Sequence, residues 1–203
     1  MTLLIYFQVG LLVWTTMFQI VNGEVVTLTE DPNFKLNGYR TRTSYKLDNV
    51  RRFVIANNET SNGSPIEGLR LLYLNANRIE FRSPDVGESY FYRPTFYKFN
   101  ESRMLIVCER GFEYSTGVDV FELNEGKVTR LGKIDMAVQE SGELHSIVSN
   151  MDVNLDGDRF VFLFKGKIVM NPGGKQEKEI DGETVKGTYV KGLPEISLTI
   201  KSN

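Results

Sequence analysis

Asp152, Asn154 and Asp156 stand at alternate positions of one short stretch and are followed by Gly157. Oxygen ligands at positions 1, 3 and 5 of a loop, with Gly at position 6, are typical of calcium loops, because the ligands converge while Gly lets the backbone turn sharply. In an EF-hand the twelfth position supplies a bidentate Glu, but here that position is Leu163. The spacing therefore excludes an EF-hand.

Two interpretations of this stretch remain. A calcium loop flanked by strands would use Asp152, Asn154 and Asp156, with Asp158 completing the ligand shell. The alternative is a hairpin turn, since Asp-Gly is a strong signal for a tight connection between two strands, and the sequence RFVFLF that follows has the composition of a strand. We favour the turn, so we predict no cofactor and keep calcium as the alternative.

The segment YFYRPTFYKF gathers aromatic residues on one predicted strand. Alternate residues of a strand point to opposite faces, so one set belongs to the core and the other is displayed. Exposed Tyr rings stack on sugars or anchor protein partners, which makes Tyr90, Tyr92 and Tyr97 candidate ligand-binding residues. Core packing is the alternative for all three. Pro94 predicts an edge strand or a bulge, because Pro cannot donate a ladder hydrogen bond.

Enzyme chemistry finds little support in the residue types. The chain has one histidine, His145, and one cysteine, Cys108, and zinc sites usually draw on several of each. Cys108 lies in the apolar run RMLIVCER, where a buried, inert thiol is expected. A hydrolase built on a pair of carboxylates needs neither residue type and remains the alternative. The net charge of −2 and the absence of a basic stripe argue against nucleic-acid binding.

Strands must position all of these residues. Short runs with period two, such as RRFVIA, LRLLYL, VDVFEL and EISLTI, alternate with turn clusters such as NEG, NLDGD and DGE. The sequence predicts an all-β fold, mainly antiparallel, built as a sandwich, a barrel or propeller-like sheets. At most one short helix is expected, with MAVQESGELHSIV as its best candidate.

One part of the chain resembles known extracellular β proteins. The stretch LIVCERGFEYSTGVDVFELNEGKVTRLGKI, together with DVNLDGD, is similar to FG-GAP and VCBS repeats and to the I-type lysozyme inhibitors of the bacterial periplasm. The inhibitor resemblance implies a protruding loop that contacts a partner, which here is Ser115, Thr116 and Gly117, preceded by Tyr114. A simple connection between two strands is the alternative.

The first 23 residues contain no charged side chain and predict a signal peptide that ends at Val21-Asn22-Gly23. An uncleaved membrane anchor over Leu3–Ile20 is the alternative. After cleavage, residues 24–203 form a single β domain, with a soft internal boundary near 83–89. The chain is therefore expected to be exported, to the periplasm or beyond the cell.

Taken together, these features predict an exported binding module that recognises a protein or a cell-envelope glycan and does not catalyse a reaction. The predicted docking surface combines the aromatic strand with residues 114–117. The alternatives are a carboxylate-dependent polysaccharide hydrolase and a structural module stabilised by calcium. A membrane is expected to matter only through an uncleaved N-terminal segment.

Overall fold

A computed structural model describes residues 20–60, 68–193 and 195–201. Its strands pair antiparallel in four separate sheets, none of which closes into a barrel. Within the described residues, the helical structure is confined to two 3-10 turns, Ile147–Asn150 and Gly182–Thr184. The prediction of an all-β, mainly antiparallel fold is confirmed, and the arrangement is consistent with packed sheets of the sandwich type.

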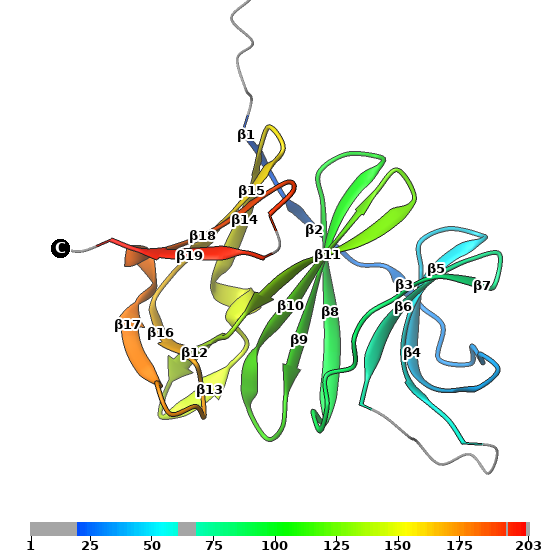
Figure 1. The fold of residues 1–203 in the computed structure, drawn as a ribbon, viewed down its shortest axis with the longest axis horizontal. Coiled ribbons are helices and arrows are strands. Elements are labelled where there is room, and N and C mark those ends of the chain that lie inside the picture. The colour runs from blue at the N-terminus through cyan, green and yellow to red at the C-terminus, as the bar shows by residue number, and fades with distance from the viewer. Residues whose placement is uncertain (1–19, 61–67, 194, 202–203) are drawn as a thin grey trace, which may run out of the picture.

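We name the four sheets by their place in the chain (Figure 1). The N-terminal sheet contains β3 (Thr29–Glu30), β4 (Tyr39–Lys46), β5 (Arg51–Asn58), β6 (Arg70–Asn75) and β7 (Arg78–Arg82). The central sheet, in spatial order, contains β11 (Lys127–Ile134), β10 (Ser115–Asn124), β9 (Arg103–Gly111), β8 (Phe91–Lys98) and β2 (Glu24–Val26). The small sheet contains β13 (Glu143–His145), β12 (Met136–Glu140), β16 (Lys167–Met170) and β17 (Lys178–Asp181). The C-terminal sheet contains β1 (Ile20–Asn22), β14 (Met151–Asp156), β15 (Arg159–Phe164), β18 (Val185–Val190) and β19 (Ser197–Ile200).

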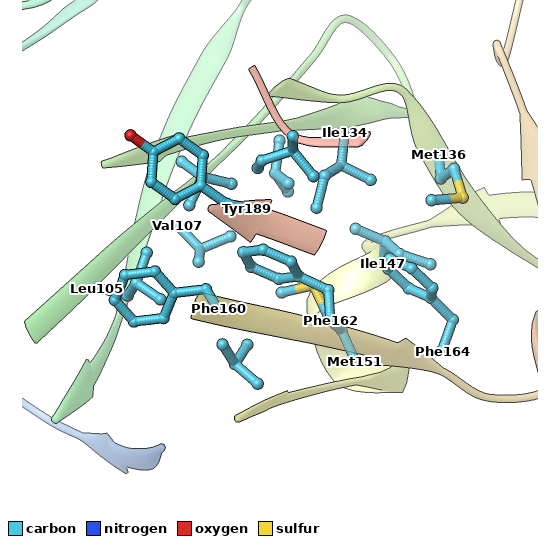
Figure 2. Close-up of a cluster of buried hydrophobic side chains, with 14 of the residues drawn as sticks. Leu105, Val107, Ile134, Met136, Ile147, Met151, Phe160, Phe162, Phe164 and Tyr189 are labelled. Carbon is cyan, nitrogen blue, oxygen red and sulfur yellow. The ribbon is translucent and has the colours of Figure 1, made fainter. Parts of the chain in front are cut away.

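The central sheet buries both of its faces, which explains its long apolar strands. On β9, Leu105 and Val107 pack toward the small and C-terminal sheets, and this core is drawn in Figure 2. Their neighbours Ile106 and Cys108 pack on the opposite face, against the N-terminal sheet. Alternation with period two therefore becomes a continuous apolar run, as expected for a strand that is covered on both sides. Cys108 is fully buried, as the sequence predicted.

The connections of the central sheet match several features of the sequence. Pro94 lies on β8 beyond the stretch Phe96–Lys98 that β2 covers, so among the described residues no strand pairs with it on that side. The segment 83–89, predicted as a soft boundary, links β7 to β8 and thus joins two sheets that share one core. The helix candidate MAVQESGELHSIV instead forms the β12–β13 hairpin, and only its end enters the 3-10 turn at Ile147.

Most of the predicted signal peptide, residues 1–19, lies outside the described residues, and so does most of the alternative membrane anchor. The last residues of the predicted leader form β1, in which Val21 pairs with Leu155 of β14. The backbone N–H of Gly23 then donates to the carbonyl of Val153 at 2.8 Å. No helix in the described part of the chain is long and apolar enough to cross a membrane.

Candidate binding groove

A groove of about 440 Å³ lies at the end of the central sheet at which β9 passes into β10, and its lining also includes the segment 84–86 that links β7 to β8 and residues of the 171–174 loop. Charged side chains dominate its walls, and Phe121 of the shared core lies at its floor. The groove is lined by Pro84, Asp85, Val86, Arg110, Thr116, Asp119, Phe121, Arg130, Lys133, Asp135, Asn171, Pro172 and Gly174.

A β-bulge in β11 places two cations on the same face of the central sheet. Arg130 pairs with Phe121 and Lys133 pairs with Asp119, while Leu131 is the extra residue between them. A spacing of three would send two side chains to opposite faces of a regular strand, but one inserted residue restores the same face. Gly132 permits this bulge, because its φ of +139° disfavours other residues.

A second bulge lies in β10, at Thr116, shortly before Asp119 in the same strand. Ser115 pairs with Gly111 and Gly117 pairs with Arg110, so Thr116 is the extra residue. The Thr116 hydroxyl donates to the backbone carbonyl of Arg110 at 3.1 Å and accepts from the Arg110 guanidinium at 3.2 Å. Bulges are frequent beside functional sites, where they re-aim side chains. Here they bring Arg110, Thr116 and the β11 cations around one carboxylate.

The charged residues of the groove form a ladder of alternating sign. Asp119 lies 3.3 Å from the Arg130 guanidinium and 3.7 Å from that of Arg110. Arg110 also forms an ion pair with Asp135, whose second oxygen lies 2.7 Å from Lys133 Nζ. Because each carboxylate contacts two cations, the ladder fixes these side chains before any ligand arrives, which lowers the entropic cost of binding.

Two buried polar side chains, Tyr92 and Cys108, lie beside Asp119 on the core side of the ladder. The Tyr92 hydroxyl donates to Asp119 at 3.2 Å, and Cys108 lies beside both groups. Burial, and then the nearby Asp119 carboxylate, raise the pKa of the Cys108 thiol well above its ordinary value. Burial raises the pKa of Tyr92 in the same direction, with Cys108 and Asp119 as further causes. Both groups are therefore neutral at physiological pH and cannot compete with Asp119 for its cations.

Buried phenols also predict a loss of stability in alkali. Burial raises the pKa of Tyr97, on the opposite face of the central sheet, from 10.0 to about 12. The unfolded chain loses this proton first, so the stabilisation is present below pH 10 and is lost as the pH rises toward 12. The loss from Tyr97 alone is about 3 kcal/mol. In guanidinium titrations at about pH 8 and about pH 12, Tyr97→Phe should lose correspondingly less stability than the wild type. An equal loss in both proteins would contradict this assignment.

An exposed aromatic rim adjoins the groove. Tyr90, which is 74% exposed, meets Phe112 edge-to-face with ring centroids 5.8 Å apart. Tyr114 follows in the same turn and is also exposed. A Cβ on Gly173 would lie 2.8 Å from the Tyr114 hydroxyl, so Tyr114 rests on the 171–174 loop that forms one groove wall. We call Tyr90, Phe112 and Tyr114 the aromatic rim.

No family model, no curated protein and no solved structure matches this chain.

The structure separates the predicted ligand-binding residues into two groups. Thr116 lines the groove, Tyr114 rests on the 171–174 loop, and Tyr90 is exposed and packs on Phe112. Tyr92 and Tyr97 are each 3% exposed and belong to the cores on opposite faces of the central sheet. Ser115 and Gly117 are buried within β10. The residues that protrude at this turn are instead Phe112, Glu113 and Tyr114, just before the segment that the inhibitor resemblance implies.

The four predicted metal ligands lie on the β14–β15 hairpin, whose turn contains Gly157 with φ +61°. Asp152 lies 2.6 Å from Lys165 Nζ, Asp156 pairs with Arg159, and Asp158 lies 3.7 Å from the Arg103 guanidinium. Asn154 sits between the two aspartates on the same strand face. Within the part of the chain that the structure describes, no three His, Cys, Asp or Glu side chains group so as to hold a metal ion.

The ladder residues Arg110, Asp119, Arg130 and Asp135 were not among the predicted site residues. Two signals point to them in retrospect. Asp119 interrupts the apolar strand VDVFEL, where a buried charge requires partners. Gly132 stands inside the predicted strand KVTRLGKI, which is the mark of a bulge or of a close backbone approach.

Proposed function

We propose that this protein is an exported binding module that holds a glycan in the groove and does not catalyse a reaction. The observation that supports this proposal is an exposed aromatic rim, one member of which, Tyr114, rests on a loop that lines a groove of fixed charges. The C–H face of a sugar ring packs on Tyr or Phe, as other apolar faces do. Its hydroxyls accept from guanidinium and ammonium groups and donate to carboxylates.

The size of the groove favours a glycan over a protein partner. Its volume of about 440 Å³ falls within the range of small-ligand sites, roughly 300–1,000 Å³. A stable protein interface buries about 800 Å² on each partner, mostly over a flatter surface. A few sugar units match the groove and its rim, whereas a protein would need further contacts outside them.

The ion pairs favour binding over hydrolysis. A carboxylate-dependent hydrolase needs one carboxyl as a proton donor beside a second that acts as a base or nucleophile. In the groove Arg110 lies between Asp119 and Asp135 and contacts both. A guanidinium placed between two carboxylates suits hydrogen bonding to a ligand better than proton transfer to one.

Removing one ring of the rim should weaken binding without unfolding the protein. For Tyr90→Ala we expect an affinity roughly ten- to a hundredfold lower, since a stacked aromatic side chain is worth about 1–3 kcal/mol. Stability should stay within about 0.5 kcal/mol of the wild type, because the side chain is 74% exposed. Affinity electrophoresis against a panel of neutral and acidic polysaccharides, paired with thermal melting, measures both quantities.

Val50→Ala is the control, since Val50 is 55% exposed and lies between β4 and β5, away from the groove lining. It should leave both affinity and stability unchanged. Failure of the wild type to bind any polysaccharide of the panel would sink the proposal. So would full affinity in Tyr90→Ala.

A further inference from the structure

We infer that the free edge of β19 is a dimer interface, at which the same strand of a second copy of this chain pairs antiparallel around a twofold axis. The C-terminal sheet ends at β19, which pairs with β18 on one side and with no other strand of the described residues (Figure 1). A strand at the end of a sheet presents unpaired backbone N–H and C=O groups, to which another strand can add. The interface joins the C-terminal sheets of two copies into one continuous sheet.

β19 lacks the protection that most other edge strands carry. Proteins commonly guard an open edge with charged residues, which disfavour pairing with another chain. Among the edge strands of the described sheets, β2, β3, β7, β11, β13 and β17 each contain at least one Lys, Arg, Asp or Glu. β1 has no charged residue but is only three residues long. β19 has four residues, and none of them is charged or proline.

The core-facing side of β19 is incompletely covered. Leu198 pairs with Gly187 and Ile200 pairs with Val185, so both side chains lie on the face that carries the core of the C-terminal sheet. Ile200 is nevertheless 47% exposed, because the sheet ends there. A strand added at this edge covers Ile200 and lengthens the existing core.

Backbone directions determine which groups of β19 are available for pairing. The N–H of Lys201 donates to the carbonyl of Thr184, at the start of β18, at 2.8 Å. Backbone groups alternate in direction along an antiparallel strand, so those of Thr199 also point to β18. Those of Leu198 and Ile200 point to the free edge.

The strand is complementary to itself in one register. With Thr199 on the twofold axis, Leu198 lies opposite Ile200 of the second copy, and these apolar pairs exchange both of their backbone hydrogen bonds. Thr199 lies opposite its own copy, which is a favourable cross-strand pair. Lys201 lies diagonal to Glu195 of the second copy, a separation that long side chains span, and both side chains are exposed.

The interface is small and separate from the groove. It ends at Ser197, because β11 approaches the next residue so closely that a Cβ on Gly132 would lie 2.9 Å from the backbone nitrogen of Ile196. Pairing over one short strand buries less than the about 800 Å² per partner of a standard interface, so we expect a dimer with a Kd of roughly 10–100 μM. None of its residues lines the groove, so the inference does not depend on the proposed function.

Sedimentation equilibrium of the purified protein from about 1 to 300 μM tests the inference, and the wild type should pass from monomer to dimer over this range. Ile200→Lys places a charge at the free edge and should raise the Kd about tenfold or more. Folding should be little affected, since the side chain is already half-exposed. Val25→Lys is the matched control, because Val25 is 61% exposed on β2, an edge strand of the central sheet, and should leave the Kd unchanged.

A charge exchange tests the register. Glu195→Lys and Lys201→Glu should each raise the Kd roughly three- to tenfold, because each replaces an attraction by a repulsion, and the double variant should restore the wild-type value. A monomer at every concentration would overturn the inference and leave the proposed function standing. A dimer that is insensitive to Ile200→Lys, or that the double variant does not restore, would also overturn it, because its contact would lie elsewhere.

Discussion

Asp119→Asn is expected to destabilise the protein by about 3 kcal/mol and to abolish ligand binding. The substitution keeps the size of the side chain but removes the charge that holds Arg110 and Arg130. Removing one partner of a buried ion pair typically costs about 3–5 kcal/mol, because the other charge stays desolvated. We place this case at the lower end, since Arg110 keeps Asp135 as a partner. Denaturant titration should show the loss as a shift of the midpoint, with an unchanged slope.

Asp152→Asn is the matched control for this effect. Asp152 also contacts a cation, Lys165, but its side chain is 52% exposed. Exposed ion pairs contribute roughly 0–1 kcal/mol, so this variant should remain within that range of the wild type. If the two substitutions have equal effects on stability, Asp119 is not the centre of a buried ladder.

Gly117→Ala is expected to destabilise the protein by about 3 kcal/mol or more and to distort the groove. Gly117 has φ +129°, a conformation that residues with a Cβ rarely adopt. A Cβ at this position would lie 2.4 Å from the carbonyl oxygen of Ile134 and 3.0 Å from Cα of Asp135. Relief of this clash must move the backbone that carries Asp135, so ligand affinity should fall together with the melting temperature, which should drop by roughly 6–12 °C.

Gly126→Ala separates backbone strain from steric overlap. Gly126 has φ +80°, but a Cβ there meets no atom within 4 Å. The substitution should therefore cost only about 1 kcal/mol and leave binding intact. A Gly117→Ala protein as stable as Gly126→Ala would show that the bulge is not tightly packed against the chain at Ile134.

The fold could be predicted because its signals are local. The apolar run around Cys108 predicted a buried strand, and the structure covers that strand on both faces. Pro94 predicted an edge strand or a bulge, and it lies on the part of β8 that β2 leaves uncovered. The Asp-Gly pair at Asp156 predicted a tight turn before a strand, and a hairpin is found there. Each of these signals depends on a residue and its immediate neighbours.

The groove could not be predicted in the same way, because it depends on long-range register. Tyr90 and Tyr92 are two residues apart, so regular alternation predicts that both point to the same face. Tyr90 is nevertheless exposed, whereas Tyr92 is buried against Asp119. Regular alternation also assigns Arg130 and Lys133 to opposite faces, and only the bulge at Leu131 reverses that assignment. Such irregularities are set by the partner strand, which the sequence does not identify.

Mapping of the bound ligand tests the central claim most directly. Amide chemical shifts of the isotope-labelled protein would be followed while an oligosaccharide derived from the polysaccharide that binds is added. We predict that the largest changes fall on Thr116, Asp119 and residues 130–135, with Tyr90 and Phe112 at the rim. Changes confined to the groove at the opposite end of the same sheet, around Leu28, Leu47 and Met104, would contradict the assignment of the site.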